Sequence, residues 1–348
     1  MLTAAEILEW NAEGPAPPLL NVQGLVKRFP VALSAHPQAD VRAVDDVTFN
    51  VSQGETLAIV GEPGCGKSTL ARLLMHLIPP DAGVVTFGGR IAGSPELSMI
   101  AYRRHVQTVF QDSAASLNPR LTIEDSIVFA ATAHGIVRSR AIRRTWPLLR
   151  RVGIDPRRFA RRYPHELSAA QRQQVNIARA LAIEPSVLIL DEPVAGLDQA
   201  TEAQVLNLLL GLKDELGLTY IFISRDLEIV RFIADRIMVM VLGKIAEMGP
   251  TEVIYRGRRH PYTEALLSSI ASVDPDRPAT AAPLAGDAPD PISPPAGCRF
   301  HTRCRYTENA CRATQPALRV MDDEHLVACH RVTASAGHLV RGGPATPL

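Results

Sequence analysis

The sequence predicts an α/β fold built around a parallel sheet, and two apolar runs support this prediction most directly. Residues 187–190 (VLIL) and 220–223 (YIFI) carry no charged side chain, as expected for strands buried on both faces of a parallel sheet. Helical patterns alternate with such strands over residues 166–250. Residues 121–165 differ, because they are rich in Ala and Arg at helical spacing and predict a helical insert.

The other segments have their own signals. Residues 20–60 contain short β-rich runs, and residues 31–42 (VALSAHPQADVR) are predicted to form a loop between two of them. Residues 272–296 are dense in Pro, Ala and Asp, which is typical of a linker. The chain begins with a segment that ends in a Pro-rich stretch and predicts a flexible leader. It ends in a Gly/Pro/Ala-rich tail that is predicted to be disordered.

Composition excludes several classes of protein. The 348 residues include 37 Lys and Arg against 36 Asp and Glu, so net charge gives no argument for nucleic-acid binding. The N-terminal residues lack the basic and apolar regions of a secretory signal, and no apolar run approaches the length needed to span a membrane. We therefore expect the five cysteines to stay reduced, which favours metal binding over disulfides where they cluster.

A phosphate-binding loop is the strongest local motif. Residues 61–69 (GEPGCGKST) follow a β-rich apolar run and precede a helix former, which is the strand–loop–helix context of a P-loop. Backbone N–H groups and the helix N-terminus would hold the phosphates, Lys67 would reach the β- and γ-phosphate oxygens, and Ser68 would ligate Mg²⁺. The residues predicted to surround the nucleotide here are Gly61, Gly64, Cys65, Gly66, Lys67, Ser68 and Thr69.

A second chemical motif follows the apolar run at residues 187–190. Asp191 at the end of this predicted strand can hold Mg²⁺ through water, and Glu192 is placed to polarise a water that attacks the γ-phosphate. Two further polar residues are noted. Gln111 follows another apolar stretch, and Ser168 is the predicted N-cap of a helix that includes Gln171 in its first turn.

The order of these motifs resembles the ATP-binding subunits of ABC transporters over about residues 20–250. The resemblance rests on the P-loop followed by VFQD, LSAAQRQQVNIARAL, VLILDEP, AGLD and IFISRDL. It implies a P-loop NTPase (RecA-like) core with an antiparallel β subdomain and a helical subdomain, with ATP and Mg²⁺ as ligands. The expected domain order is a leader (1–19), a nucleotide-binding domain (20–250, helical subdomain about 112–170), an extension and linker (251–296), a Cys-rich module (297–330) and a tail (331–348).

The resemblance also assigns roles to single residues. Gln111 corresponds to the Q-loop glutamine, which senses Mg²⁺ and the γ-phosphate. Ser168 and Gln171 lie in the signature loop, which in this family caps the ATP bound by the opposite subunit. Asp198 corresponds to the D-loop aspartate at the dimer seam, and Phe29 to the aromatic residue that stacks on adenine.

Two departures from the family pattern concern catalysis. Ala169 and Ala170 stand where the signature LSGGQ has two glycines, which let backbone N–H groups approach a phosphate closely. Two Cβ atoms would hinder that approach, and left-handed backbone geometry would cost each alanine about 1 kcal/mol or more. Arg225 stands where the family has a histidine that helps to order the attacking water, and arginine cannot accept a hydrogen bond. The hypothesis is that the chain binds ATP but hydrolyses it slowly at its own site; the alternative is that both variants have little effect.

Four cysteines near the C-terminus predict a metal site. Cys298, Cys304, Cys311 and Cys329 are spaced C-x5-C-x6-C-x17-C, without the tight pairs of structural zinc sites. Four thiolates can equally hold an iron–sulfur cluster, and two nearby histidines, His301 and His330, are alternative ligands.

This region resembles the C-terminal extension of the oligopeptide/dipeptide (and nickel) importer ATPases. The likeness rests on GPTE at 249–252, HPYTEALL at 260–267 and GCRFHTRC at 297–304, with SLNPR at 116–120 in support. It implies a 4Fe–4S cluster on the four cysteines, while zinc and unliganded thiols stay open as alternatives.

The resemblance implies an energy-coupling role. Two such subunits would sandwich two ATP molecules and drive two transmembrane permease subunits, to which an extracytoplasmic solute-binding protein delivers a peptide-type solute. The degenerate motifs favour a different chain as the second ATPase subunit, and the expected location is the cytoplasmic face of the inner membrane, as a peripheral subunit. The surface around Gln111 and the helical insert would receive the permeases. The alternatives are a non-catalytic ATP-binding structural or regulatory subunit and a non-transport ABC ATPase.

Overall fold

The computed structural model describes residues 17–33, 36–257, 259–269, 289–322 and 324–332. The predicted leader, linker and tail therefore lie wholly or largely outside the described residues. The chain divides into two compact units. Unit 1 comprises residues 1–21, 50–55 and 85–223, and unit 2 comprises residues 22–49, 56–84 and 224–348.

Unit 2 contains a mixed sheet in the order β11-β12-β10-β9-β3. β3 (Thr56–Val60) and β9 (Arg236–Val241) pair in parallel, and all five side chains of β3 are buried, as its apolar sequence requires. The other strands pair antiparallel and are β10 (Lys244–Pro250), β11 (Arg319–Asp322) and β12 (His325–Val327).

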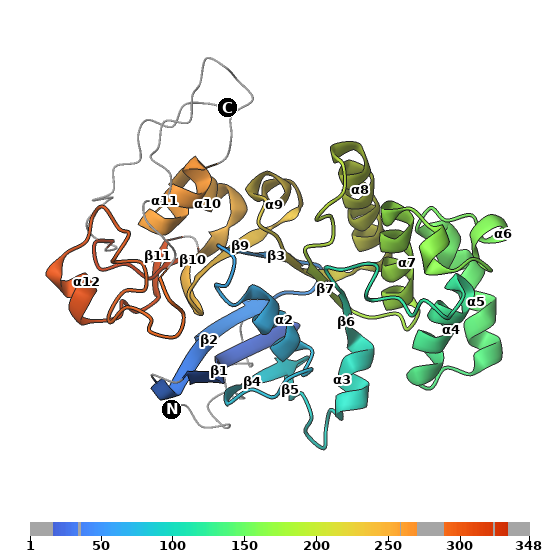
Figure 1. Cartoon of the computed structure of the whole chain (residues 1–348), viewed down its shortest axis with the longest axis horizontal. Coiled ribbons are helices and arrows are strands. Elements are labelled where there is room, and N and C mark those ends of the chain that lie inside the picture. Colours follow the sequence, from blue (N-terminus) through green and yellow to red (C-terminus); the bar gives the residue numbers. More distant parts are fainter. Residues whose placement is uncertain (1–16, 34–35, 258, 270–288, 323, 333–348) are drawn as a thin grey trace, which may run out of the picture. The chain divides into compact units, whose positions relative to one another are not determined.

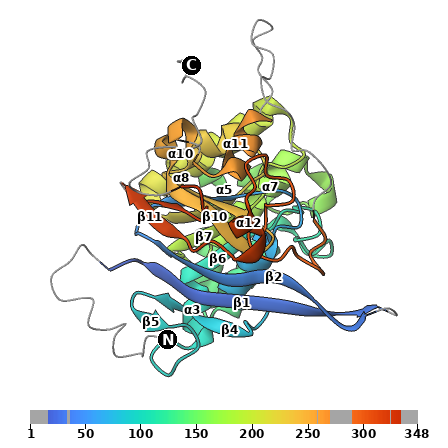
Figure 2. The ribbon, with the colours of Figure 1, turned by 90° about the vertical axis from the view of Figure 1, so that its left-hand side faces the viewer.

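Unit 2 also holds most of two long strands, β1 (Leu20–Leu33) and β2 (His36–Val51), which run side by side in Figures 1 and 2. The prediction of a loop over residues 31–42 was wrong, because both strands extend into this segment. Pairing with a neighbouring strand outweighs the weak β propensity of the sequence there. β2 is an edge strand, where the missing N–H donor of Pro37 is tolerated.

In unit 2, α2 (Lys67–Leu74) and α9 (Leu227–Ile233) precede β9 in the chain. α10 (Thr251–Gly257), α11 (Pro261–Ser268) and α12 (Asn309–Ala313) follow it. α10 and α11 pack against β10 (Figure 1). Glu247 of β10 anchors the last segment: its carboxylate accepts N–H donors from Arg259 and His260, and His325 Nε2 lies 2.7 Å from its Oε1 with both side chains fully buried.

Unit 1 contains the predicted parallel strands in the order β8-β7-β6. They are β6 (Val106–Val109), β7 (Val187–Asp191) and β8 (Thr219–Ile223). Before them come α3 (Met99–His105) and β5 (Arg90–Ile91), which pairs antiparallel with the end of β4 (Ala82–Phe87). The long helix α8 (Gln199–Leu216) follows β7.

The predicted helical insert is present in unit 1. It consists of α4 (Ile123–Ala133), α5 (Arg138–Arg151), α6 (Pro156–Phe159) and a short 3₁₀ turn (Pro164–Glu166), and it leads into α7 (Ala169–Leu181). α4 packs against both α5 and α7. Among the helices of the described ranges, none is long and apolar enough to cross a membrane.

Candidate nucleotide-binding site

The P-loop lies in unit 2 between β3 and α2, and its close contacts explain its glycines. Gly66 caps α2 with φ 108°, and a Cβ added there would lie 2.1 Å from the carbonyl oxygen of Ala43. A Cβ on Gly61, at φ 150°, would lie 2.3 Å from the carbonyl oxygen of Met240. The loop can therefore hold its turn against neighbouring strands only with glycine at these two positions.

Lys67 is buried within the loop. Its Nζ donates hydrogen bonds to the carbonyl oxygens of Gly61 at 2.7 Å and Glu62 at 3.1 Å. Ser68 and Thr69 follow in the first turn of α2, where the helix N-terminus favours anions. Cys65 is buried beside Lys67, and its burial raises the pKa of the thiol, so it is a small uncharged residue of the loop.

The predicted catalytic carboxylate, Glu192, and the predicted Q-loop glutamine, Gln111, lie together in unit 1. Gln111 follows β6 and Glu192 follows β7, and because these strands are parallel neighbours their carboxyl ends meet at one edge. Gln111 Nε2 donates to Glu192 Oε2 at 2.7 Å. Asp191 ends β7, and the N–H of Glu192 donates to the carbonyl of Ile223 at 3.0 Å.

Glu192 has an unusual backbone. Its φ of 46° lies in the left-handed region, which costs a residue with a Cβ about 1 kcal/mol or more. Such strain persists where surrounding contacts fix the residue, and here the strand register and the hydrogen bond from Gln111 do so. The hydrogen bond from Gln111 holds the carboxylate of Glu192 toward the segment that follows β6.

The signature segment begins a helix. Ser168 is the N-cap of α7, its Oγ accepts the N–H of Gln171 at 3.2 Å, and Gln171 Oε1 accepts the N–H of Ser168 at 3.0 Å, which is a capping box. Ala169 and Ala170 lie in the first turn of α7, and neither has a positive φ. The expectation of left-handed strain at these alanines was wrong, because the helix already begins here and alanine suits it.

Asp198, the predicted D-loop residue, is exposed at the N-cap of α8. Its carboxylate accepts the N–H of Thr201 at 3.0 Å and the hydroxyl of Thr201 at 2.7 Å. These hydrogen bonds, the backbone one first, hold the pKa of Asp198 below its usual value, so it is ionised near neutral pH.

Two further predicted residues are exposed in unit 2. Arg225 lies in the turn before α9, between Ser224 and the N-cap Asp226, whose N–H donates to Ser224 Oγ at 3.0 Å. Phe29 on β1 has an exposed ring, and Lys27 Nζ lies 5.7 Å from its centroid. An exposed ring on a strand can stack on a planar group.

The four predicted cysteines are brought together in unit 2. Cys298, Cys304, Cys311 and Cys329 line one small cavity with His301 and His330. Burial raises the pKa of the Cys298 thiol to about 11 and also raises the pKa values of Cys304 and Cys329. In the absence of a cation these thiols would therefore be protonated at neutral pH.

Four cysteine side chains line this cavity, yet within the described residues no group of three or more His, Cys, Asp or Glu side chains is placed to hold a metal ion. One nitrogen of each histidine contacts a backbone oxygen: His301 Nδ1 lies 2.9 Å from the Cys298 carbonyl, and His330 Nε2 lies 2.8 Å from that of Thr314.

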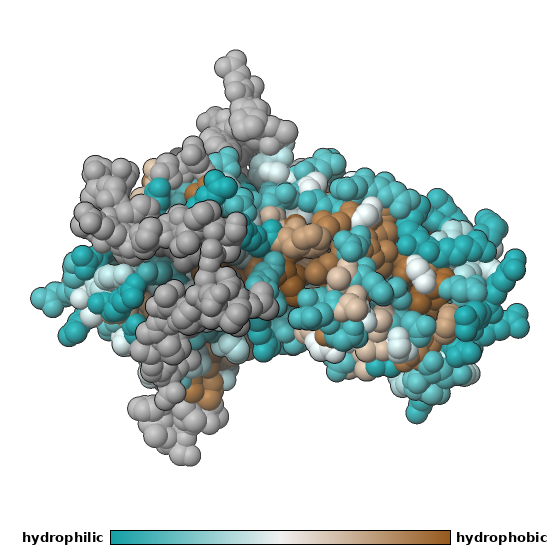
Figure 3. All heavy atoms as spheres, turned by 90° about the horizontal axis from the view of Figure 1, so that it is seen from above, coloured by the Kyte–Doolittle hydropathy of each residue, from teal (hydrophilic) through white to brown (hydrophobic). Residues whose placement is uncertain are grey.

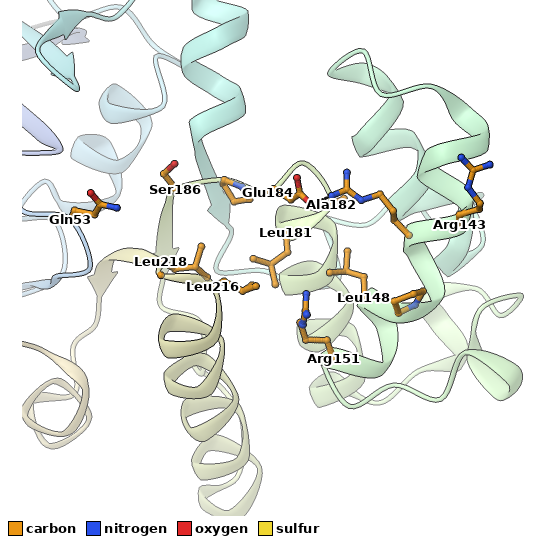
Figure 4. A pocket seen from close by; sticks show the side chains of 14 residues that line it. Gln53, Arg143, Leu148, Arg151, Leu181, Ala182, Glu184, Ser186, Leu216 and Leu218 are labelled. Carbon is orange, nitrogen blue, oxygen red and sulfur yellow. Dashed lines mark ion pairs between the residues drawn. The ribbon is translucent and has the colours of Figure 1, made fainter.

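Unit 1 has a separate pocket of about 520 Å³ that the sequence analysis did not predict. Leu148 of α5 and Leu181 of α7 line it, with arginines of α5 around them (Figure 4). Arg144 forms an ion pair with Glu184, and Arg151 donates to Glu215 at 2.8 Å. None of the predicted site residues lies in this pocket.

Comparison with known proteins agrees with this geometry. Residues 44–195 match a family model described as ABC transporter, and residues 246–311 match one described as oligopeptide/dipeptide transporter, C-terminal region. The strands, the P-loop and the signature helix thus define an ABC-type ATPase. The chain belongs to the ATP-binding subunits of the oligopeptide/dipeptide ABC transporter family.

Individual relatives cover almost the whole chain. The probable peptide ABC transporter ATP-binding protein y4tS of Sinorhizobium fredii is 47% identical over 327 residues, which are 92% of each chain. The oligopeptide transport ATP-binding protein AppF of Bacillus subtilis is 43% identical, over 90% of this chain and 97% of its own. Among solved structures, cbiO1 of Clostridium perfringens, part of the ABC transporter complex cbiONQ, has a TM-score of 0.59 and 29% identity, and the match covers 69% of this chain and 92% of that one.

A second solved structure shows a related cassette after hydrolysis. It is the dimeric ATP-binding cassette MJ0796 bound to ADP and Pi, with a TM-score of 0.59 and 26% identity, and the match covers 67% of this chain and 98% of that one.

Proposed function

We propose that this chain energises the import of peptides by hydrolysing ATP in a nucleotide-sandwich dimer. The observation that carries the proposal is the pairing of Gln111 with Glu192 at the ends of parallel strands, in a chain whose P-loop holds Lys67. The peptide solute is supported by relatives named as peptide import and oligopeptide transport proteins.

The residues of the chain divide the work. The loop N–H groups and Lys67 bind the phosphates, Ser68, Asp191 and Gln111 hold Mg²⁺, and Glu192 orients and polarises the attacking water. When bound, Mg²⁺ neutralises the charge that develops on the phosphate oxygens. Phe29 stacks on adenine.

A second ATPase subunit completes the site. Ser168 and Asp198 are exposed at helix N-caps, and with Gln171 they form the surface offered to the partner's ATP. The dimeric state of a similar cassette supports this arrangement. Because Arg225 and the two signature alanines depart from the family pattern, the partner is a different chain with intact motifs.

The permease subunits dock on the helical part of unit 1. Large apolar side chains are exposed there, among them Phe129, Val137, Trp146 and Tyr163, and so is Phe110 beside the Q-loop. Figure 3 shows apolar side chains gathered on the face of the molecule that is seen from above. Exposed apolar patches of this kind mark protein interfaces. The chain is thus peripheral, on the cytoplasmic face of the membrane, and an extracytoplasmic binding protein supplies the solute.

Co-purification tests this assignment. When the tagged full-length chain is isolated from detergent-solubilised membranes, we expect two permease subunits and a second ATPase to accompany it. Recovery without membrane proteins, or with ribosomes or DNA, would contradict the transport role and favour a non-transport ABC ATPase.

The proposed nucleotide-binding domain covers residues 20–250, and the proposed Cys-rich module covers residues 297–330. We propose that this module holds a 4Fe–4S cluster. Four cysteines that line one cavity support this proposal, because four thiolates can hold a 4Fe–4S cluster. Anaerobically purified protein should contain about four iron and four sulfide per chain and absorb visible light. Cys304→Ser should lose the iron, whereas Cys65→Ser, in the P-loop, should keep it. Stoichiometric zinc, or protein free of metal, would contradict the cluster.

A further inference from the structure

A partly buried ion pair joins the Cys-rich module to the P-loop within unit 2. Arg303, the residue before Cys304, donates from Nη1 to Glu62 Oε2 at 2.7 Å and from Nη2 to Glu62 Oε1 at 3.0 Å. The side chain of Arg303 is 6% exposed and that of Glu62 is 23% exposed. A guanidinium–carboxylate pair with two hydrogen bonds fixes the orientation of both side chains, and each charge neutralises the other.

Glu62 is the second residue of the P-loop, and its backbone is held as well. Its carbonyl accepts a hydrogen bond from Lys67, and its N–H donates to Tyr262 Oη at 2.9 Å. Tyr262 of α11 is fully buried, and its ring packs against Phe300 at a centroid distance of 5.2 Å. Phe300 and Arg303 both lie in the Cys-rich module, between Cys298 and Cys304. This segment therefore contacts Glu62 directly through Arg303 and indirectly through Tyr262.

A second ion pair from the same loop reaches the neighbourhood of the P-loop. Arg299 Nη2 donates to Asp45 Oδ2 at 2.6 Å, and Lys244 Nζ lies 3.4 Å from the same oxygen. The N–H of Asp45 donates to the carbonyl of Gly243, whose own N–H donates to the carbonyl of Cys65. Burial alone would raise the pKa of Asp45, but Lys244 and Arg299 outweigh it and hold that pKa below its usual value.

We infer that Arg303 is a positioning residue for ATP binding: it pairs with the Glu62 carboxylate and neutralises its charge in the loop that contains Lys67. The inference rests on ATP binding at this loop, as proposed above. An ATP triphosphate carries several negative charges, and an unpaired carboxylate in the loop that holds it would repel it. The module thus contributes to the nucleotide site of its own chain.

Equilibrium ATP affinity of the full-length chain tests this role. Arg303→Ala should weaken ATP binding by about tenfold, because it leaves the Glu62 carboxylate unpaired in the loop that binds the phosphates. Glu62→Gln alone should bind within about twofold of the unmodified chain, and Glu62→Gln with Arg303→Ala should recover most of the lost affinity. The matched control is Arg305→Ala, two residues along, whose exposed ion pair with Glu264 does not touch the P-loop.

The salt dependence separates an electrostatic role from a merely structural one. The loss of affinity caused by Arg303→Ala should shrink as ionic strength rises, since salt screens the unpaired Glu62 carboxylate, which is 23% exposed in the unmodified chain. The inference is overturned if Arg303→Ala and Arg305→Ala have the same ATP affinity. It is also overturned if the folded double variant binds ATP as weakly as Arg303→Ala. If Arg303→Ala does not fold, Arg303→Lys takes its place in the test. Arg303→Lys should cause a smaller loss of ATP affinity, and adding Glu62→Gln should remove that loss. Lys67→Ala, which should abolish binding, shows independently whether ATP binds at this loop at all.

Discussion

Glu192→Gln is expected to slow ATP hydrolysis by the purified chain at least about 100-fold while leaving ATP affinity unchanged. Glutamine has the shape of glutamate, and its carbonyl oxygen can still accept the hydrogen bond that Gln111 Nε2 now donates to the carboxylate at 2.7 Å. The substitution therefore keeps the geometry and removes the group that polarises the attacking water. P-loop binding through Lys67 should be untouched.

Single-turnover hydrolysis with the chain in excess is the measurement, because every nucleotide site in that sample is the chain's own. The matched control is Glu215→Gln on α8, whose exposed carboxylate pairs with Arg151 and takes no part in the site. If the rate with Glu192→Gln equals that of the unmodified chain, the residual hydrolysis does not use this carboxylate. The chain would then be the non-catalytic ATP-binding subunit considered as the alternative.

The sequence predicted the parts of the site that are local in the chain. The P-loop is formed within nine consecutive residues, so the motif and the flanking apolar runs were enough to place it. Its partners were not visible: Gly66 is required because of Ala43 on β2, and Gly61 because of Met240 on β9. These contacts depend on strand register, which a single sequence does not reveal.

Side-chain contacts between segments that are distant in the chain could not be predicted from the sequence. Arg303 and Glu62 are 241 residues apart and Tyr262 and Glu62 are 200 apart, and arginine, glutamate and tyrosine are common surface residues. A partial signal existed, because Tyr262 and Arg303 lie inside the HPYTEALL and GCRFHTRC stretches. Those stretches indicated a family, and only the packing of the Cys-rich loop against the P-loop gives these two residues a role.

The wrong expectation at Ala169 and Ala170 has a physical reason too. Besides hindrance by two Cβ atoms, it assumed a cost of left-handed backbone geometry, but Ser168 and Gln171 close a capping box that begins α7 at this point. Alanine is a good residue in a first helical turn, so the substitution costs no backbone strain. Of the two departures from the family pattern, Arg225 is therefore the one expected to affect catalysis more.

Arg225→His is expected to raise the single-turnover hydrolysis rate of the purified chain by about tenfold or more. A guanidinium only donates hydrogen bonds and stays charged, whereas neutral imidazole can accept one from the attacking water. Arg225 is exposed in the turn before α9, so the change creates no cavity. Arg225→Ala is the control, because it removes the arginine without supplying an acceptor and should give no comparable gain.

The gain should also depend on pH in a defined direction. Histidine has an unperturbed pKa of about 6.5, so the acceptor is present above that pH and is lost as protonation sets in below it. The Arg225→His rate should therefore fall towards that of the unmodified chain between about pH 7.5 and pH 5.5, while the Arg225→Ala rate follows the unmodified chain throughout. An unmodified chain that already hydrolyses ATP at an ordinary rate, with no increase on Arg225→His, would show that arginine serves this site as well as histidine. The requirement for a partner ATPase with intact motifs would then lose its support.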